Sequence, residues 1–277
     1  MRRLLWAFII IAAVVAAPVS AATVDGLKIH ASVTGTGTRT IVFVHGWTCD
    51  ASSWAAQVSA FDKTHRVITL DLPGHGRSDS PKDGRFSMDL FARAVEAVRA
   101  EANAEKIVLV GHSMGAPVIR QYARLFPGRV AALVAVDGPL DIRGFPPPQA
   151  GQAPPPMTGP EGLEAREAMI RGMFTKDTPA ALQQQVLKMM LDTPEATAAG
   201  AMAAVFDPAL RTSDVLPMPA LAVFAGTAQV PDEAVTRQVL PDYEAAQIAG
   251  TGHFLMMEKP DEFNRLLAAF LDRIESR

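Results

Sequence analysis

"IVLVGHSMG", residues 107–115, places a serine between two glycines directly after a continuous apolar run. Residues 107–110 form the kind of run that a strand buried on both faces shows, and helical periodicity follows the motif. A tight turn between strand and helix throws the side chain of Ser113 outward, and Gly111 and Gly115 let the two elements approach closely. This context predicts that Ser113 is a catalytic nucleophile.

Two backbone N–H groups are candidates for an oxyanion hole. One belongs to Met114, which follows the serine at the start of the predicted helix. The other belongs to Trp47, in a turn that follows the predicted strand at 41–44 and in which Gly46 permits a sharp bend. The alternative for this turn is an ordinary connection from a strand to a loop; we favour the oxyanion role.

A serine hydroxyl is a weak nucleophile and needs a base within hydrogen-bond reach. His253 is the candidate base, because it follows the last predicted strand on a loop loosened by Gly250 and Gly252. A nucleophile in mid-chain and a base near the end is also the order expected for this kind of turn. The other histidines lie on a predicted strand, in turns or before a strand: His30, His45, His65, His75 and His112.

Predicted strands and helices alternate, which indicates a parallel sheet wrapped by helices. The strands are expected at 28–33, 41–44, 66–70, 107–110, 130–136, 220–225 and 244–248, and the helices of the core at 52–61, 87–102, 115–126 and 261–274. The alternation breaks at 140–216, which begins with proline-rich chain and continues with helical stretches near 162–174, 179–191 and 194–206. We therefore predict a core formed by 23–139 and 217–277, with 140–216 inserted as a helical cap.

The composition is that of an ordinary globular protein. The 277 residues are 49% hydrophobic and 20% charged, and a chain of this length can form one domain with a large core. The formal net charge of −3 gives no indication of nucleic-acid binding. Cys49 is the one cysteine, so no disulfide can form within the chain, and nothing in the sequence nearby favours a nucleophilic role for it.

The first 22 residues have the pattern of a secretory signal peptide. A basic start at Arg2 and Arg3 precedes 14 apolar residues, 4–17, and small residues then allow a cut after Ala21 or Ala22. A retained membrane anchor is the alternative, but a membrane span needs about 20 apolar residues. We therefore expect an exported protein, periplasmic or secreted, that contacts a membrane only if this segment stays uncleaved.

Taken together, the motifs resemble those of the α/β-hydrolase superfamily. They are Val44-His45-Gly46-Trp47, Asp71-Leu72-Pro73-Gly74-His75-Gly76-Arg77-Ser78, Gly111-His112-Ser113-Met114-Gly115 and Gly252-His253. The resemblance covers nearly all of the chain outside the signal segment and the cap. It implies an α/β fold with a mostly parallel sheet of about eight strands and a cap inserted after the sixth. It does not determine the substrate, because this fold hosts many chemistries.

The acid of the catalytic triad is the open question. Members of the family usually carry it in the loop after the strand that follows the cap, where this sequence has Gln229. A neutral amide cannot stabilise an imidazolium by charge. Some members carry the acid instead at the end of the strand that follows the helix of the nucleophile, and there this sequence has Asp137, 24 residues after Ser113.

Asp137 is our first candidate for this acid, because a carboxylate at the end of an apolar run needs a partner such as His253. Its alternative role is to cap the turn before Gly138 and Pro139. Asp232 is the second candidate, although Pro231-Asp232-Glu233 also suits the first turn of a helix.

We therefore expect an exported serine hydrolase that cleaves a carboxylic ester or a related acyl bond through an acyl-enzyme, with no metal and no cofactor. The partner is expected to be a small molecule with an apolar acyl group, because the cap is rich in apolar side chains that suit an adaptable pocket, unless they form only the core of the cap. These are Met157, Met169, Met173, Phe174, Met189, Met190, Met202 and Phe206.

Other functions on the same fold stay open. They are those of a lactonase, a thioesterase, a hydrolase of carbon–carbon bonds and a cofactor-free haloperoxidase. Haloalkane dehalogenases and most epoxide hydrolases are disfavoured, because they have Asp where this chain has Ser113. A non-catalytic ligand-binding pseudoenzyme, in which Gln229 marks a decayed triad, is the alternative from a different class.

Overall fold

The structure is a computed structural model that describes residues 17–18, 22–141, 143 and 156–276. Most of the predicted signal peptide, residues 1–16 and 19–21, lies outside the described residues. The same holds for residues 142 and 144–155, which contain most of the predicted proline-rich start of the cap.

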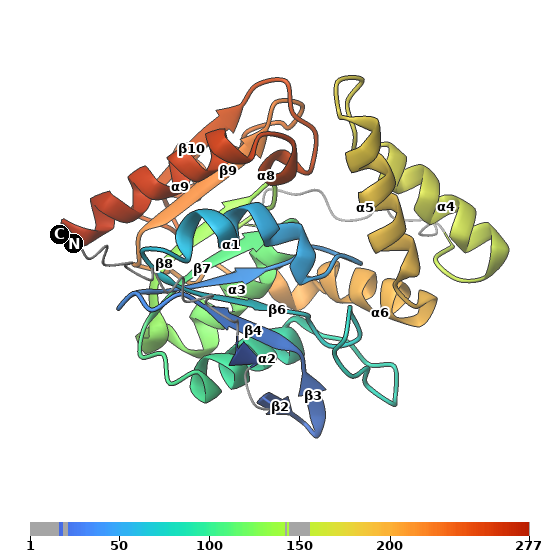
Figure 1. Ribbon diagram of the computed structural model, residues 1–277, viewed down its shortest axis with the longest axis horizontal. Helices are drawn as coiled ribbons and strands as arrows, with labels where there is room; N and C mark the ends of the chain where they lie inside the picture. Colours follow the sequence, from blue (N-terminus) through green and yellow to red (C-terminus); the bar gives the residue numbers. More distant parts are fainter. Residues whose placement is uncertain (1–16, 19–21, 142, 144–155, 277) are drawn as a thin grey trace, which may run out of the picture.

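An eight-stranded sheet forms the centre of the molecule, in the order β1-β4-β6-β5-β7-β8-β9-β10 (Figure 1). Its strands are β1 (Ala17–Pro18), β4 (Ala31–Thr34), β5 (Thr40–Val44), β6 (Arg66–Leu70), β7 (Ile107–His112), β8 (Val130–Val136), β9 (Ala220–Ala225) and β10 (Tyr243–Ile248). The strands from β6 to β10 in this order pair in parallel, and only β1 and β4 run antiparallel to their neighbours. The predicted fold class is confirmed.

The strand predicted over residues 28–33 is wrong in one respect, because it is two strands. β3 (Leu27–Ile29) pairs with β2 (Ala22–Val24) in a separate two-stranded sheet, and β4 alone joins the main sheet. Between them, His30 donates its N–H to Ser78 Oγ (2.8 Å) and accepts the N–H of Asp71 (2.9 Å). The loop after β6 therefore takes the hydrogen bonds that a continuous strand would use.

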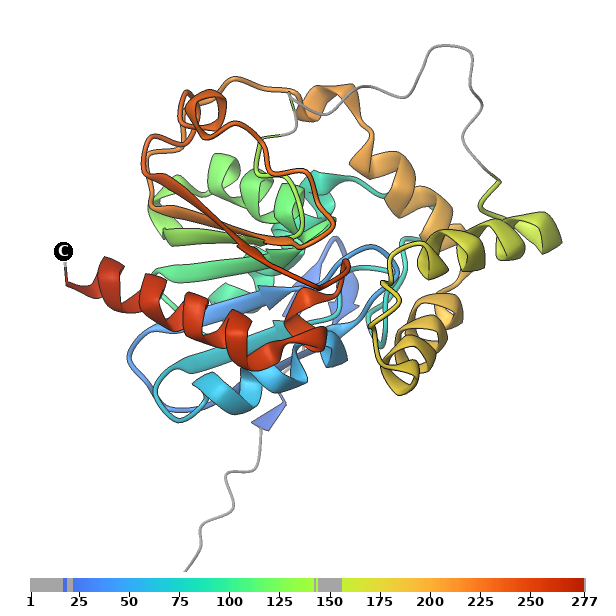
Figure 2. The same ribbon diagram turned by 90° about the horizontal axis from the view of Figure 1, so that it is seen from above.

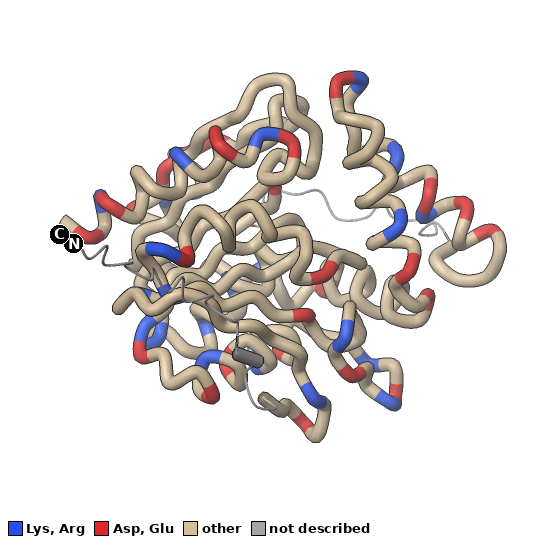
Figure 3. The backbone as a smooth tube through the Cα atoms, viewed as in Figure 1, with Lys and Arg blue, Asp and Glu red and all other residues tan. Residues whose placement is uncertain are grey.

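Helices cover both faces of the main sheet, as Figures 1 and 2 show. On one face α1 (Ala55–Phe61) contacts α9 (Pro260–Glu275), and on the other α2 (Met88–Glu101) contacts α3 (Gly115–Leu125). Because of this double cover every residue of β5 is buried. The charged residues lie mainly on the outer helices and loops, with both signs interspersed (Figure 3).

Three helices between β8 and β9 stand apart from the sheet in both views. They are α4 (Gly159–Arg171), α5 (Ala180–Asp192) and α6 (Glu195–Val205), and α4 contacts both of the others. Their position is consistent with a cap over the carboxyl ends of the parallel strands. Among the described residues, no helix combines the length and the apolar character that a membrane span needs.

Candidate active site

Ser113 stands in a tight turn between β7 and α3, with a φ of +52°. This left-handed conformation is strained for a residue with a side chain. The turn is held by a bond from the Ser113 N–H to the carbonyl of Val136 and one from the Ala116 N–H to the carbonyl of Ser113, both 2.9 Å. A methyl group added at Gly111 would lie 2.3 Å from the carbonyl oxygen of Gly115, so the close packing of strand and helix requires a glycine there.

His253 and Asp137 are directly bonded. Nδ1 of His253 lies 2.6 Å from Oδ2 of Asp137, and the other carboxylate oxygen accepts the N–H of Ala225 at 2.8 Å. Burial alone would raise the pKa of Asp137, but the hydrogen bond and charge of His253, together with the Ala225 N–H, hold this pKa below its ordinary value. An ionised Asp137 fixes the proton of the imidazole on Nδ1 and leaves Nε2 free to accept one.

The backbone of His253 is bonded on both sides. Its N–H donates to the carbonyl of Met173, just after α4, and its carbonyl accepts the Nε2–H of His112, both at 2.9 Å. Burial lowers the pKa of His112 to about 3, and the neighbouring His253 contributes to this, so the His112 ring is neutral. One residue before His253, the Gly252 N–H donates to both carboxylate oxygens of Glu258, at 3.1 and 3.0 Å. The core, through His112, and the segment that follows α4, through Met173, therefore hold the loop of His253 together.

A single cavity of about 420 Å³ brings four of the predicted residues together, whereas Trp47 is not among the residues that line it. Ser113, Met114, Asp137 and His253 all border it. Its remaining lining residues are Pro117, Gly138, Pro139, Val205, Phe206, Phe224, Ala228 and Gln229. No described lysine or arginine borders this cavity, and most of its wall is apolar.

The turn that contains Trp47 runs beside Ser113. A methyl group added at Gly46 would lie 3.1 Å from Cβ of Ser113. The indole N–H of Trp47 donates to the carbonyl of Ala198 in α6 at 2.8 Å. The side chain therefore points to the cap, while the backbone stays beside the turn that carries Ser113. The next residue, Thr48, is completely buried and has a φ of +53°.

Asp232, the second candidate for the triad acid, lies elsewhere. Its Oδ1 accepts the N–H of Ala234 at 2.8 Å and caps the short helix α7 (Glu233–Thr236). It does not border the cavity, whereas Gln229 does. The structure therefore brings Asp137, and not Asp232, to His253.

Sequence reasoning missed the residues that support this arrangement. The sequence places His112 only in the turn, and it gives no sign of the contacts of Glu258 or of the cap carbonyls of Met173 and Ala198. His112 adjoins the nucleophile, which could have drawn attention to it. The other contacts join parts of the chain far apart in sequence, and no local pattern marks them.

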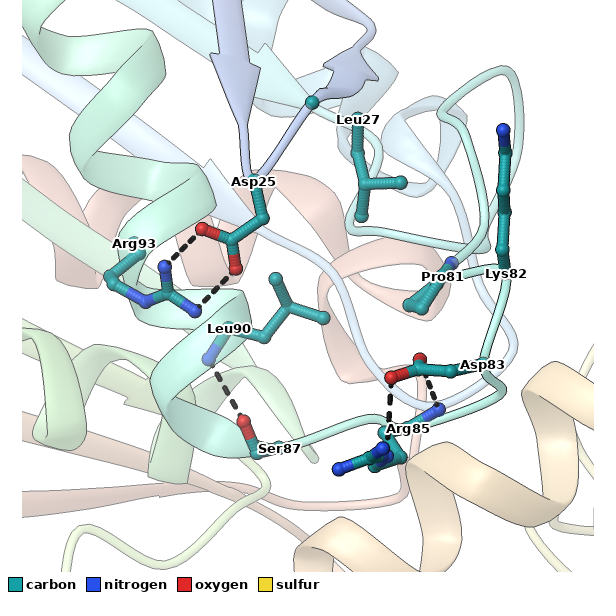
Figure 4. A pocket seen from close by; sticks show the side chains of 10 residues that line it. Asp25, Leu27, Pro81, Lys82, Asp83, Arg85, Ser87, Leu90 and Arg93 are labelled. Carbon is teal, nitrogen blue, oxygen red and sulfur yellow. Dashed lines mark hydrogen bonds and ion pairs between the residues drawn. The ribbon is translucent and has the colours of Figure 1, made fainter.

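Two of the larger hollows of the described structure lie away from Ser113. One, of about 640 Å³, lies beside the β2–β3 turn and the start of α2 (Figure 4). Four of its five charged side chains form pairs, because Arg93 bonds both oxygens of Asp25 (2.6 and 2.7 Å) and Arg85 pairs with Asp83 (3.1 Å). The other, of about 860 Å³, lies near the amino ends of β5 and β6. Neither brings a nucleophile and a histidine together. Within the described part of the chain, no cluster of three or more His, Cys, Asp or Glu side chains is arranged to hold a metal ion.

Residues 41–266 match the family described as the Alpha/beta hydrolase family. A dihydrolipoyllysine-residue acetyltransferase component of the acetoin cleaving system, from Cupriavidus necator, is 29% identical over 90% of this chain and 68% of its own length. A 2-hydroxy-6-oxononadienedioate/2-hydroxy-6-oxononatrienedioate hydrolase from Paraburkholderia phymatum is 39% identical, but the match spans only 40% of either protein. A solved structure described as an N-acyl homoserine lactone degrading enzyme superimposes with a TM-score of 0.74 at 26% identity, over 90% of this chain and 98% of that one.

Proposed function

Since this chain belongs to the Alpha/beta hydrolase family, we propose that it is a serine hydrolase that cleaves a carboxylic ester or a related acyl bond. The observation that carries the proposal is the 2.6 Å bond between His253 and Asp137 at the cavity that Ser113 also borders. A nucleophile, a base and a group that orients the base are the parts that acyl transfer requires.

In the proposed mechanism, Ser113 Oγ attacks the substrate carbonyl and Nε2 of His253 takes its proton. Asp137 holds the imidazole in the correct tautomer and stabilises the imidazolium that forms. The N–H groups of Trp47 and Met114 bind the oxyanion. His253 then protonates the leaving group, and a water molecule activated by the same histidine hydrolyses the acyl-enzyme.

The cavity supports a small, neutral and apolar acyl group. Its volume of about 420 Å³ is at the small end for ligand sites. The relative from Paraburkholderia phymatum is named for dicarboxylate substrates, and a carboxylate in an apolar cavity needs a cationic partner. Because no described lysine or arginine borders the cavity, we propose that dicarboxylates are poor substrates here.

Lactone hydrolysis is the second candidate. A lactone is a cyclic ester, so the same residues would open it by the same steps. The structural similarity to an N-acyl homoserine lactone degrading enzyme favours this alternative over a thioesterase. Parallel assays with a linear ester and a lactone of equal acyl length decide between the two.

We also propose that the protein is exported, which rests on the sequence of residues 1–22 alone. Cleavage after Ala21 or Ala22 would remove β1, the edge strand that pairs Ala17 with Val33. The mass of the protein recovered from a bacterial periplasm tests this proposal. Full-length protein in the cytoplasmic fraction would contradict it.

A fluorophosphonate probe tests the catalytic proposal. The wild-type protein should be labelled, and Ser113→Ala should not be. Asp232→Asn serves as the matched control, because it lies outside the cavity and asparagine caps a helix as well as aspartate does. Wild-type protein that resists the probe, or labelling that survives Ser113→Ala, would reject a serine mechanism and favour a non-catalytic binding protein.

A further inference from the structure

The strained turn beside the nucleophile is held by the cap. Thr48 has a β-branched side chain, is completely buried and adopts a φ of +53°. Such a conformation is unfavourable for a residue with a β-branched side chain and persists only where surrounding contacts impose it. Within the turn, a single backbone bond closes the chain, from the Cys49 N–H to the carbonyl of Gly46 at 3.2 Å.

Two hydrogen bonds between the cap and this turn complete its support. The hydroxyl of Thr193, at the end of α5, donates to the carbonyl of Thr48 at 2.9 Å. The indole N–H of Trp47 donates to the carbonyl of Ala198 in α6 at 2.8 Å. Both bonds lie in buried surroundings, where water cannot replace a lost partner.

Thr193 is itself held in place from the other side. Its carbonyl accepts a bond from Nη1 of Arg166, a buried arginine of α4, at 3.2 Å. The Nε of the same guanidinium has no hydrogen-bond partner among the described residues. A continuous buried path, Arg166 to Thr193 to Thr48, therefore links two elements of the cap, α4 and the end of α5, to the turn that contains Trp47.

We propose that Thr193 is a positioning residue that holds the backbone N–H of Trp47 in the orientation required to bind the oxyanion. The proposal rests on the proposed function, because it assigns a role within that reaction. When the bond from Thr193 is absent, the peptide of Thr48 can relax from its left-handed conformation, and the N–H one residue earlier turns with it. The cap thus acts on the transition state and not only on substrate binding.

Thr193→Val tests this role, because valine keeps the shape of threonine and removes only the hydroxyl. Loss of a complete oxyanion donor costs about 10²–10³ in kcat; we expect a misdirected donor to lower kcat about tenfold, with KM changed less than about twofold. Thr193→Ser restores the hydroxyl and should return kcat to within about twofold of the wild type.

The matched control is Thr197→Val. Thr197 is also a buried threonine of the cap, but its hydroxyl has no hydrogen-bond partner among the described residues. This variant should keep the wild-type kcat. Equal losses in Thr193→Val and Thr197→Val, or an unchanged kcat in Thr193→Val, would overturn the proposal.

Hydrogen exchange gives a readout that does not depend on turnover. The amides of residues 46–50 should exchange about fivefold faster in Thr193→Val, as expected for the loss of a bond worth about 1 kcal/mol. If Thr193→Val fails to fold, Trp47→Phe removes the other bond between the cap and this turn, the one to the carbonyl of Ala198, and should speed exchange in the same amides. A wild-type protein that cleaves no ester or lactone would reject the proposed function, whereas unchanged exchange in these variants would reject the role of Thr193.

Discussion

Nδ1 of His253 lies 2.6 Å from Oδ2 of Asp137, although 116 residues separate the two in the chain. The order of the sheet explains this proximity. β8, which ends just before Asp137, pairs with β7, which leads to Ser113, and β9 lies between β8 and the strand that precedes His253. The carboxylate beside His253 therefore comes from the end of the strand next to the one that leads to Ser113, and not from the loop that carries Gln229.

Asp137→Asn should lower kcat by about 10³–10⁴, because an amide at this position cannot stabilise the imidazolium and favours the wrong tautomer. Initial rates on a p-nitrophenyl ester measure the effect. Asp232→Asn, which preserves the cap of α7, should stay within about twofold of the wild type. The assignment would be wrong if Asp232→Asn lost activity while Asp137→Asn kept it.

The free energy of unfolding should fall as the pH falls from about 6.5 toward 3. Burial lowers the pKa of His75 and of His112 to about 3, from an ordinary value of 6.5. Between these values the unfolded chain binds protons that the folded chain excludes, so acid favours unfolding. Each group contributes up to about 1.4 kcal/mol per pH unit.

Urea unfolding of the wild type and of His75→Gln between pH 4 and pH 7 checks this dependence. The variant should show the shallower slope, whatever its stability at neutral pH. If the free energy of unfolding changed equally with pH in the wild type and the variant, His75 would not remain neutral in the folded protein.

Phe206→Ala should shift the substrate preference toward longer acyl chains. Phe206 borders the cavity from the end of α6, and its side chain is partly open to solvent. Room for two further methylene groups is worth about 1.6 kcal/mol, which is about tenfold in the ratio of kcat/KM for long and short esters. Leu163→Ala, which removes an exposed apolar side chain of the cap away from the cavity, is the control and should leave this ratio unchanged.

Cys49 should not react with a thiol reagent in the native protein. Burial, and to a lesser extent the charge of Asp50, raises the pKa of this thiol far above its ordinary value. The thiolate is the reactive form, so both access and ionisation oppose reaction. Ellman's reagent should detect one thiol per chain in urea and almost none without it. Rapid reaction of the native protein would contradict the buried position.

The places of Ser113 and His253 could be predicted because each depends on a local pattern. The tight turn at Ser113 is indicated by a strand, two glycines and a helix in immediate succession. His253 stands out by its glycine-rich loop after the last strand. Asp137 required the order of the strands as well, which the family resemblance supplied and which sequence periodicity does not contain.

The contacts of the cap could not be predicted in the same way. The bonds of Trp47 to Ala198 and of Thr193 to Thr48 join residues 151 and 145 positions apart. Each depends on where a whole helix settles on the core. The break between β3 and β4 at His30 has the same origin. The N–H of His30 donates to the distant Ser78, whereas strand propensity alone predicts that it pairs within a sheet.

The place of Asp137 before the cap also bears on engineering. Ser113 and Asp137 lie within one stretch of the core that is complete before residue 140, so a foreign cap can be grafted between β8 and β9 without cutting through that stretch. The bond of Thr193 to Thr48 sets the condition for such a chimaera. A donor cap would need a hydroxyl at this point and a carbonyl in place of that of Ala198, or the transplanted protein would bind its new substrate and turn it over slowly.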